Sequence, residues 1–382
     1  MKSITIYEYI WLAKDQSLRS KSRTLVQEID GVREKRELDE LPLKERKNLE
    51  WTYDGSSTGQ ADGKKSEIIL KPCAMYNDPF RGPPHKLLLC EGVDENNVPV
   101  SGYNREKAEK IFKNRMHEEP WYGIEQEYVL MIDNKPLGFP ENGYPSPQGP
   151  YYCGVGTESV VGRQIAEEHY QLCLDAGLTI SGINAEVMLG QWEYQVGPCK
   201  GIDSGDELWM SRYIMHRVCE NHGVSFNLEP KPVEGDWNGS GAHTNFSTKT
   251  MRENGSKEYL HNLLDKLVNN HKLHIENYGK DNDKRLTGNH ETSSMEKCTY
   301  GAGDRGASIR ISRELVKSNY KSGYIEDRRP SSNMDPYLVT SLLAETCIDV
   351  LDEEAEIKPL IDNLENEFSE GPDIHGMDCG RY

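Results

Sequence analysis

Residues 122–130 read YGIEQEYVL, and they belong to an apolar-rich run over residues 121–132 that predicts a buried β-strand. Glu125 and Glu127 are two residues apart in this run, so the two-residue period of a strand places both side chains on one face. Like charges at neighbouring positions of a sheet destabilise it unless a cation lies between them. Two solvated carboxylates on an exposed face are the simpler alternative, and the pair alone does not decide between the two.

A second acidic pair lies in residues 183–196, INAEVMLGQWEYQV, which predict two strands joined by a turn. If Leu189 and Gly190 form a two-residue hairpin turn, Glu186 and Glu193 lie directly opposite each other, with Cβ atoms about 5 Å apart. That separation suits carboxylates that bridge a metal ion, and it is unfavourable for two bare anions. The apolar residues around the pair make a solvated face less favourable than a metal site.

His243 and Glu326 lie beside stretches rich in glycine and arginine. His243 follows residues 237–242, WNGSGA, whose glycines let backbone N–H groups approach an anion closely, although a tight turn explains such a run equally well. Glu326 precedes residues 327–330, DRRP. Oxygen-rich sites with one imidazole suit Mg²⁺ or Mn²⁺ better than zinc or copper. The candidate ligands are Glu125, Glu127, Glu186, Glu193, His243 and Glu326, although spacing alone does not unite the last two with the acidic pairs.

Arginines gather in one part of the chain, although its net charge is −18. Within residues 285–329 they are Arg285, Arg305, Arg310, Arg313, Arg328 and Arg329. Alternation over residues 306–312 places Ser308, Arg310 and Ser312 on one strand face. Any one arginine is as compatible with an ion pair to a protein carboxylate as with a ligand. Together, beside a candidate metal site, they favour recognition of phosphate and carboxylate groups, a combination that phosphoryl transfer requires.

The overall charge argues against nucleic acids and anionic membranes as partners, because phosphate binding needs a basic face. The nine cysteines contain no Cys-x-x-Cys pair, which is typical of reduced thiols rather than of a disulfide framework or a zinc site. Residues 1–11 include Glu8 and no long apolar core, so no signal peptide is predicted. No apolar run approaches the roughly 20 residues of a membrane span. These features predict a cytoplasmic protein.

The length of 382 residues favours two domains. Strands are predicted over residues 24–29, 66–70 and 86–90, the second ending at Pro72, and they indicate a small sheet-rich N-terminal domain. A polar stretch over residues 94–104 marks the boundary. Helices are predicted over residues 105–116, 158–176, 206–221, 257–277 and 336–352, with Gly177 and Asp335 as caps.

Several longer motifs resemble glutamine synthetase of the eukaryotic type, type II. They are residues 18–25 (LRSKSRTL), 53–60 (YDGSSTGQ), the two segments with the paired glutamates, 238–251, 285–292 (RLTGNHET), 304–311 and 324–333. These motifs cover nearly the whole chain in the family's order. The resemblance implies an α+β protein with a small N-terminal β-grasp domain over residues 15–98 and a larger glutamine synthetase/guanido kinase-type catalytic α/β domain over residues 104–382. It also implies self-association into stacked rings, as a homodecamer, with active sites between subunits.

The same resemblance implies ATP-dependent ligation of ammonia to L-glutamate through a γ-glutamyl phosphate, which yields L-glutamine, ADP and phosphate. It implies two or three Mg²⁺ or Mn²⁺ ions in each active site. One ion would be held by Glu127, Glu186 and Glu193. Another would be held by Glu125, His243 and Glu326.

Further site residues are implied by the resemblance alone. Glutamate would be bound by Glu127, Asn238, Gly239, Arg285, Arg305 and Arg328. ATP would be bound by Trp121, Glu125, Glu193, Asn245, Ser247, Arg305, Arg310 and Tyr324. The catalytic residues would be Asp54, which takes a proton from ammonium in a neighbouring subunit's site, Glu291, which closes a loop over the intermediate, and Arg305 and Arg328, which face the transferred phosphoryl group.

The sequence departs from the family pattern at a few positions. The family usually has Pro-Ala at residues 189–190, Asn at Asp304 and Pro at Ser312. Asp304 adds a negative charge beside Arg305 and is expected to soften its hold on phosphate. Residues 13–17 and 379–382 are predicted to lie away from the chemistry. Three other functions stay open: a ligase that joins a larger amine such as a polyamine to glutamate, a guanidino kinase, and an inactive homologue.

Overall fold

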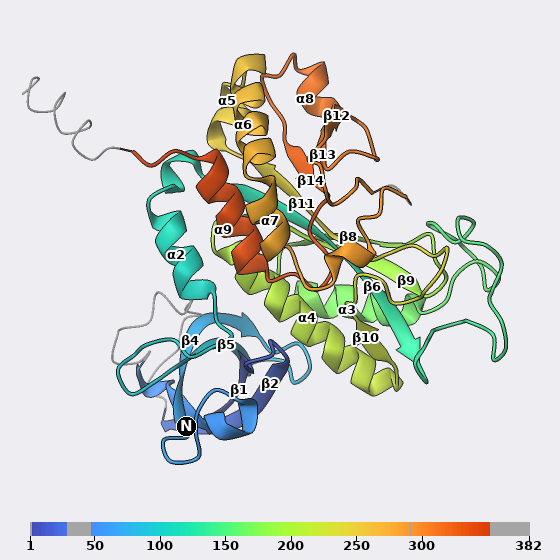
Figure 1. The fold of residues 1–382 in the computed structure, drawn as a ribbon. Helices are drawn as coiled ribbons and strands as arrows, with labels where there is room; N and C mark the ends of the chain where they lie inside the picture. The colour runs from blue at the N-terminus through green and yellow to red at the C-terminus, as the bar shows by residue number, and fades with distance from the viewer. Residues whose placement is uncertain (1, 29–46, 290–291, 352–382) are drawn as a thin grey trace, which may run out of the picture.

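The computed structural model describes residues 2–28, 47–289 and 292–351, which form two β-sheets and the helices packed against them (Figure 1). The smaller sheet has the order β2-β1-β5-β4-β3. Its strands are β1 (Lys2–Leu12), β2 (Leu18–Glu28), β3 (Trp51–Asp54), β4 (Glu67–Asn77) and β5 (Lys86–Val93). β1 pairs parallel with β5, and the other pairings are antiparallel.

Both faces of the smaller sheet are covered by apolar side chains. Tyr9 and Leu88 belong to a cluster on one face, whereas Ile10 and Leu89, one residue further along, join the main core of the molecule. This alternation follows from the two-residue period of the strands. The smaller sheet therefore shares its core with the rest of the chain.

The strands predicted over residues 24–29 and 86–90 are confirmed within β2 and β5 as far as the described residues extend. β4 does not end at Pro72, as the sequence predicts, but continues to Asn77. The pairing of β4 with β5 shifts register between Pro72 and Ala74, and this irregularity accommodates a residue that has no N–H to donate. β1, which precedes the predicted domain start at residue 15, belongs to the same sheet.

The larger sheet surrounds β6 (Trp121–Ile132), which matches the predicted strand residue for residue. Its main order is β12-β13-β14-β11-β6-β9-β8, and β7 and β10 also pair with β6. The bounds are β7 (Lys135–Pro136), β8 (Ile180–Ala185), β9 (Gln191–Lys200), β10 (Ser225–Asn227), β11 (Ala242–Ser247), β12 (Tyr300–Ala302), β13 (Ile309–Ile311) and β14 (Ile325–Asp327).

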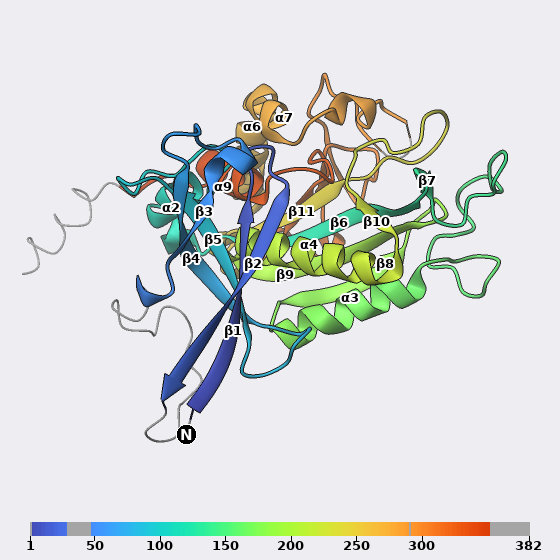
Figure 2. The same ribbon diagram turned by 90° about the horizontal axis from the view of Figure 1, so that it is seen from below.

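Helices pack on one face of the larger sheet, where α3 and α4 lie against β8, β9 and β6 (Figure 2). The helices are α2 (Arg105–Lys113), α3 (Arg163–Ala176), α4 (Asp203–His222), α5 (Lys249–Glu253), α6 (Lys257–Asn269), α7 (His271–Asn277), α8 (Arg313–Lys317) and α9 (Pro336–Cys347). Short 3₁₀ turns are η1 (Gly55–Thr58), η2 (Met116–Glu118) and η3 (Asn282–Lys284). Among the described residues, none of these helices is long and apolar enough to cross a membrane.

The predicted helices exist, with corrected bounds. Gly177 ends α3 in the left-handed conformation and Asp335 caps α9 by accepting from the Tyr337 N–H, as the sequence predicts. The single helix predicted over residues 257–277 is wrong, because the chain divides at Asn270 into α6 and α7. α9 ends at Cys347 rather than at residue 352.

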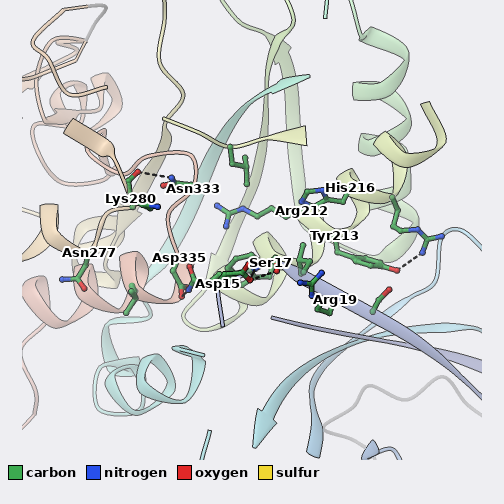
Figure 3. A pocket seen from close by; sticks show the side chains of 18 of the residues that line it. Asp15, Ser17, Arg19, Arg212, Tyr213, His216, Asn277, Lys280, Asn333 and Asp335 are labelled. Carbon is green, nitrogen blue, oxygen red and sulfur yellow. Dashed lines mark hydrogen bonds between the residues drawn. The ribbon is translucent and has the colours of Figure 1, made fainter. Parts of the chain in front are cut away.

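A crevice of about 920 Å³ lies where the smaller sheet meets the helices of the larger unit (Figure 3). Residues 15–20 line one side of it, and side chains from α4, the end of α7 and the start of α9 line the other. The face of the larger sheet away from α3 and α4 carries a second, strongly polar pocket.

Candidate active site

Strand β6 positions two glutamates because its side chains alternate between the faces of the larger sheet. Gln126 is fully buried and accepts from Arg212 of α4, so Glu125 and Glu127 point away from the helices. In the pairing of β6 with β9, Glu127 lies opposite Glu193. In the pairing of β6 with β11, Glu125 lies opposite His243. The register of three strands thus brings four of the predicted ligands to one face.

The predicted opposition of Glu186 and Glu193 across a two-residue turn is wrong. Glu193 pairs with Asn184, and β8 ends at Ala185, before Glu186 is reached. The Glu186 N–H donates to the Gln191 carbonyl at 2.9 Å, so the connection from 186 to 190 is a longer loop. Its Gly190 has φ of 82° and lies against the backbone of Leu137, where a Cβ atom would clash. This longer loop, rather than a two-residue turn, brings the carboxylate of Glu186 close to that of Glu193.

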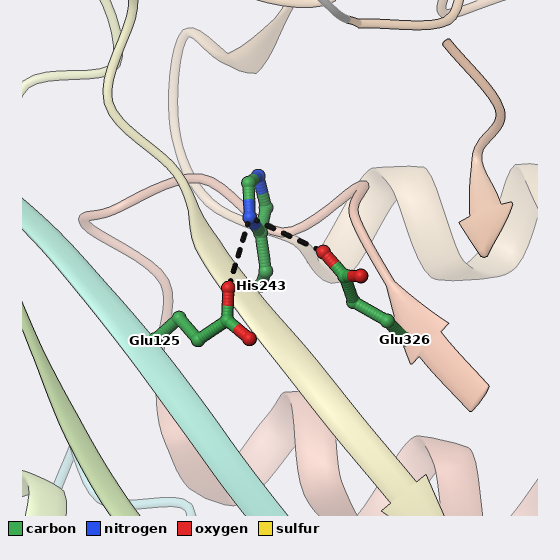
Figure 4. A group of neighbouring side chains, drawn as sticks. All are labelled: Glu125, His243 and Glu326. Atoms are coloured by element: carbon green, nitrogen blue, oxygen red, sulfur yellow. Dashed lines mark ion pairs between the residues drawn. The ribbon is translucent and has the colours of Figure 1, made fainter. Parts of the chain in front are cut away.

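The candidate ligands form two groups. Oxygen atoms of Glu127, Glu186 and Glu193 lie within 4.8 Å of one another. Ligand atoms of Glu125, His243 and Glu326 meet the same limit (Figure 4). His243 Nδ1 lies 3.5 Å from Glu125 Oε2 and 3.6 Å from Glu326 Oε1.

Uncharged donors orient the carboxylates of the first group. The Gly241 N–H donates to Glu127 Oε2 at 2.7 Å, Asn184 Nδ2 donates to Glu186 Oε1 at 2.9 Å, and Gln195 Nε2 donates to Glu193 Oε1 at 2.8 Å. In the second group, Asn245 Nδ2 donates to Glu125 Oε1 at 2.8 Å. Such outer hydrogen bonds hold metal ligands in place without neutralising them.

Burial makes the ionised form of these carboxyl groups costly. Burial, together with the negative charge of Glu186, raises the pKa of Glu127 to about 8. Burial likewise raises the pKa of Glu186 to about 7 and that of Glu193 well above its usual range. Burial lowers the pKa of His243, so its imidazole is neutral near pH 7 and suited to bind a metal. A divalent cation would compensate the concentrated negative charge.

Arginines line the same pocket of about 350 Å³, called the acidic pocket below. Arg328 Nη1 donates to Glu326 Oε1 at 2.5 Å, and Arg310 Nη1 donates to Glu326 Oε2 at 3.0 Å. Arg285 is buried, and its Nη2 donates to the carbonyl groups of residues 328–330. The other predicted residues on its lining are Asn238, Gly239 and Arg305.

A second cavity of about 460 Å³ adjoins the acidic pocket and shares Glu125 and Gln195 with it. Besides Glu125, its lining includes four further residues predicted to bind ATP, namely Trp121, Asn245, Ser247 and Tyr324. Trp121 is partly exposed and carries Arg252 over its ring, with the guanidinium carbon 4.0 Å from the ring centroid. Exposed aromatic rings beside a charged pocket suit a ligand with a flat apolar part and an anionic part.

Comparison with known proteins assigns the chain to a family. The model for the glutamine synthetase catalytic domain matches residues 105–263. A glutamine synthetase of Neurospora crassa is 51% identical over 350 residues, which are 91% of this chain and 93% of that protein. The chain belongs to the glutamine synthetase family.

Two plant members of the glutamine synthetase family show comparable similarity. A cytosolic isozyme of Pinus sylvestris is 50% identical over 348 residues, 90% of this chain and 93% of that protein. A chloroplastic glutamine synthetase of Brassica napus is 51% identical over 348 residues, 90% of this chain and 78% of that protein. Family members that are about 50% identical to this chain are therefore named as cytosolic in one case and as chloroplastic in another.

Two predicted catalytic residues, Asp54 and Glu291, are not among the described residues that line either cavity. Asp54 lies at the end of β3, where its carboxylate accepts from the Ser56 N–H at the start of η1, and it is absent from the described lining of the pocket. Glu291 lies outside the described residues. Of the positions that depart from the family pattern, Ser312 caps α8 by accepting from the Leu315 N–H, and Asp304 accepts from the Gly306 N–H.

Sequence reasoning missed Asn184 and Gln195, which orient the ligands, and Arg252, which covers Trp121. Asn184 is two residues before Glu186, and Gln195 is two residues after Glu193. The two-residue strand period that joined Glu125 to Glu127 would also have placed Gln195 beside Glu193. Arg252 follows β11 in sequence, and no local pattern indicates its contact with Trp121.

Proposed function

We propose that the acidic pocket is the place where this member of the glutamine synthetase family joins ammonia to L-glutamate at the expense of ATP. The observation that carries the proposal is the pair of ligand groups, Glu127–Glu186–Glu193 and Glu125–His243–Glu326, each within 4.8 Å, beside the four arginines that line the acidic pocket. The chain is a ligase of glutamine biosynthesis by family membership. The assignment of individual residues to roles belongs to the proposal.

The donor set fits hard divalent cations. Five carboxylates and one neutral imidazole offer the oxygen-rich environment that Mg²⁺ and Mn²⁺ prefer, and the raised carboxyl pKa values indicate negative charge that lacks full compensation. We assign one ion to each ligand group. Bound divalent ions would neutralise the phosphate charges of ATP and so reduce their repulsion of an attacking carboxylate.

In the first step, an oxygen of the substrate's γ-carboxylate attacks the terminal phosphorus of ATP, and the bond from that phosphorus to the bridging oxygen of ADP breaks. Arg285, with Asn238 and Gly239, holds the amino acid. Arg305 and Arg328 face the transferred phosphoryl group and stabilise its negative charge. The nucleotide is bound in the adjoining cavity by Trp121, Asn245, Ser247 and Tyr324, and from the acidic pocket by Arg310. Glu291 shields the γ-glutamyl phosphate from water.

In the second step, Asp54 accepts a proton from ammonium, and the ammonia nitrogen attacks the acyl carbon. The bond from that carbon to the phosphate oxygen breaks, and hydrogen phosphate leaves with a proton from the nitrogen, which gives the amide. Hydrogen bonds from Ser56 and Ser57 lower the pKa of Asp54, so its carboxylate is ionised at neutral pH. Its position on the smaller sheet and its absence from the described pocket lining support supply by a second subunit. We therefore propose the homodecamer of stacked rings, in which a neighbour completes each site.

The proposal extends to domain organisation and location. Strands β2, β3, β4 and β5 of the smaller sheet lie within residues 15–98 and support a β-grasp domain there, to which β1 adds a strand before residue 15. The catalytic domain over residues 104–382 follows. The name of the pine isozyme supports a cytoplasmic location.

The test is an amine panel. Purified protein with Mg²⁺, ATP and glutamate is expected to release phosphate and form glutamine with ammonia, and much more slowly with methylamine or putrescine. Preference for putrescine would contradict the ammonia assignment, and no turnover with any amine would indicate an inactive homologue. Native mass spectrometry tests the assembly, because a fully active monomer would contradict the role of Asp54 across an interface.

A further inference from the structure

A buried polar cluster lies behind strand β14, on the face opposite to Glu326. Glu326 belongs to the second ligand group, whereas Asp327, the next residue, points the other way because strand side chains alternate. Asp327 is fully buried and accepts from Arg329 Nε at 2.9 Å and from Arg329 Nη2 at 2.7 Å. The Tyr278 hydroxyl at the end of α7 donates to Asp327 Oδ2 at 2.8 Å. Nothing in the proposed reaction uses Asp327, Arg329 or Tyr278.

His271, the first residue of α7, connects this cluster to a distant loop. Arg329 Nη1 donates to His271 Nδ1 at 3.1 Å, and His271 Nε2 lies 2.9 Å from the Met295 carbonyl oxygen. Because a guanidinium can only donate, Nδ1 is the acceptor, and the proton of the neutral ring lies on Nε2, where it is donated to Met295. Burial lowers the pKa of His271, so the ring is neutral near pH 7. The imidazole thus bridges the end of β14 and residue 295.

Met295 belongs to a loop that begins at Arg285 and folds back on itself. The Met295 N–H donates to the Leu286 carbonyl at 3.1 Å, and Thr292 Oγ1 donates to the Arg285 carbonyl at 3.2 Å. Arg285 and Thr292 both line the acidic pocket. The returning limb of this loop, residues 292–296, therefore lies beside the place where glutamate is proposed to bind.

The two limbs of the loop are held to the rest of the molecule unequally. On the first limb, Arg285 Nη2 donates to the carbonyl groups of residues 328–330 at 2.9, 2.9 and 3.0 Å. On the returning limb, within the part of the chain that the structure describes, the bond from His271 is the one hydrogen bond to an element outside residues 285–299. The position of the returning limb therefore depends on His271.

We propose that His271 is a positioning residue for glutamine formation, and that its hydrogen bond to Met295 holds the returning limb against the acidic pocket so that water is kept from the γ-glutamyl phosphate. The inference rests on the proposed function, in which the shielding residue Glu291 immediately precedes this limb in the sequence. His271 does not line the acidic pocket and acts through the loop.

A displaced limb would allow water to compete with ammonia. Water attacks the acyl carbon, and the bond from that carbon to the phosphate oxygen breaks. Glutamate and hydrogen phosphate form, and one proton is released to solvent. ATP is then consumed without formation of glutamine, so the role of His271 is measured by the phosphate released for each glutamine made.

Two amide substitutions separate the two bonds of His271. The side chain of His271→Gln reaches as far as Nε2 and still donates to Met295. That of His271→Asn reaches only as far as Nδ1, so it accepts from Arg329 but stops short of Met295. Each variant keeps one of the two bonds, which makes their overall stabilities comparable. His222→Asn is the matched control, at a half-buried histidine of α4 that bonds to Glu168 and lines neither cavity of the proposed active site.

Hydrogen exchange of the full chain, measured by mass spectrometry, tests the position of the limb. One hydrogen bond changes a local opening equilibrium by about fivefold, so backbone amides of residues 292–299 should exchange about fivefold faster in His271→Asn than in the wild type. His271→Gln and His222→Asn should exchange as the wild type does. Unchanged exchange in His271→Asn would overturn the proposal, as would faster exchange throughout α6 and α7, because that would show a general loosening.

The functional test measures phosphate and glutamine in the same reaction at saturating Mg²⁺, ATP, glutamate and ammonia. The wild type, His271→Gln and His222→Asn should release equal amounts of the two products, and His271→Asn should release about twice as much phosphate as glutamine. Equal amounts in His271→Asn, even at a reduced rate, or the same excess of phosphate in His271→Gln would overturn the proposal. Failure of the wild type to form glutamine would instead contradict the proposed function.

Discussion

The two ligand groups lie in one pocket, yet their negative charge is balanced in different ways. Glu127, Glu186 and Glu193 receive hydrogen bonds from uncharged groups, and burial raises their pKa values. In the other group, Glu326 bonds to Arg310 and Arg328, and His243 contributes no charge of its own. The first group thus depends on a cation from solution, whereas the protein itself already compensates part of the second.

Because of this difference, we expect the two groups to respond differently to the loss of one ligand. The carboxylates of the first group receive their hydrogen bonds from uncharged donors, so this group loses charge and metal affinity when one carboxylate is neutralised. The second group has Arg310 and Arg328 beside it, and a metal ion bound there can also be coordinated by the phosphate oxygens of ATP. The loss of one of its side-chain ligands should therefore cost less. The predictions below test that contrast, beginning with the largest expected effect.

The largest effect is expected for Glu127→Gln. The change removes one charge and one metal ligand from the first group, Glu127–Glu186–Glu193. Residues that only hydrogen-bond to a metal ligand typically cost roughly 10- to 100-fold when they are replaced, and the loss of glutamine formation should exceed that range. The measurement is the rate of phosphate release as a function of Mg²⁺ concentration. Glu109→Gln, at an exposed position of α2, serves as the control. A Glu127→Gln rate within tenfold of the wild type would disprove a metal role for this group.

A smaller loss is expected for His243→Ala, because Glu125 and Glu326 remain and ATP phosphates supply further oxygen ligands. We expect a loss of about 10- to 100-fold, expressed mainly as a higher KM for Mg²⁺–ATP than for glutamate. Steady-state kinetics with each substrate varied in turn separates the two effects. His117→Ala, at an exposed position in η2, is the control. Equal rises in both KM values would contradict the division of labour between the groups.

Gln195→Ala should reduce Mg²⁺ affinity by about tenfold, because Gln195 orients Glu193 without binding the ion itself. Calorimetric titration with Mg²⁺ measures this directly. Gln171→Ala removes a comparable amide from the surface of α3 and should leave the affinity unchanged. If Gln195→Ala binds Mg²⁺ normally, the outer hydrogen bond does not position Glu193.

The raised pKa values in the first group, Glu127–Glu186–Glu193, predict that the stability of the metal-free protein depends on pH. Glu186 and Glu127 have pKa values of about 7 and 8 in the native state against 4.5 for an ordinary glutamate, so the native state holds more protons between these values. The free energy of unfolding should therefore fall as pH rises from 4.5 to about 8 and then level off. Urea denaturation of dialysed, metal-free protein at a series of pH values measures the slope.

Two comparisons sharpen this pH experiment. Glu127→Gln should have a shallower slope, because one of the two titrating groups is gone. Saturating Mg²⁺ should raise the stability most at the high-pH end, where the carboxylates are ionised. If the free energy of unfolding falls equally steeply with pH in the wild type and in Glu127→Gln, the loss of stability arises from groups other than Glu127.

The local strand period predicted much of this site, and long-range register supplied the rest. The shared face of Glu125 and Glu127 follows from spacing of two along β6, and that prediction is confirmed. The pairing of Glu127 with Glu193 depends on which strands are neighbours, and no local pattern determines that. The turn between β8 and β9 was predicted wrongly because Gly190 fits a tight turn equally well in a two-residue hairpin and in the longer loop observed.

Packing between distant segments was likewise beyond local reasoning. The break between α6 and α7 at Asn270 interrupts a continuous helical pattern. Arg212 and Gln126 are separated by 86 positions, and their contact follows only from the packing of α4 on β6. The alternating and capping patterns therefore predicted elements, whereas tertiary packing decided which of them meet.

The smallest effect is expected for Asp304→Asn. Asp304 and Arg305 are both exposed, and exposed charge pairs contribute only about 0–1 kcal/mol, which corresponds to a change in phosphate affinity of about fivefold at most. Asp304 Oδ1 already accepts from the Gly306 N–H at 2.9 Å, and an asparagine oxygen can accept the same bond, so the turn should persist. The KM for ATP of the variant, measured at low and at high salt, should be slightly lower than that of the wild type, with the difference vanishing at high salt. A change beyond tenfold would mean that Asp304 contacts the substrate directly, and the arginine-compensated side of the pocket would then be less shielded than the comparison of the two groups indicates.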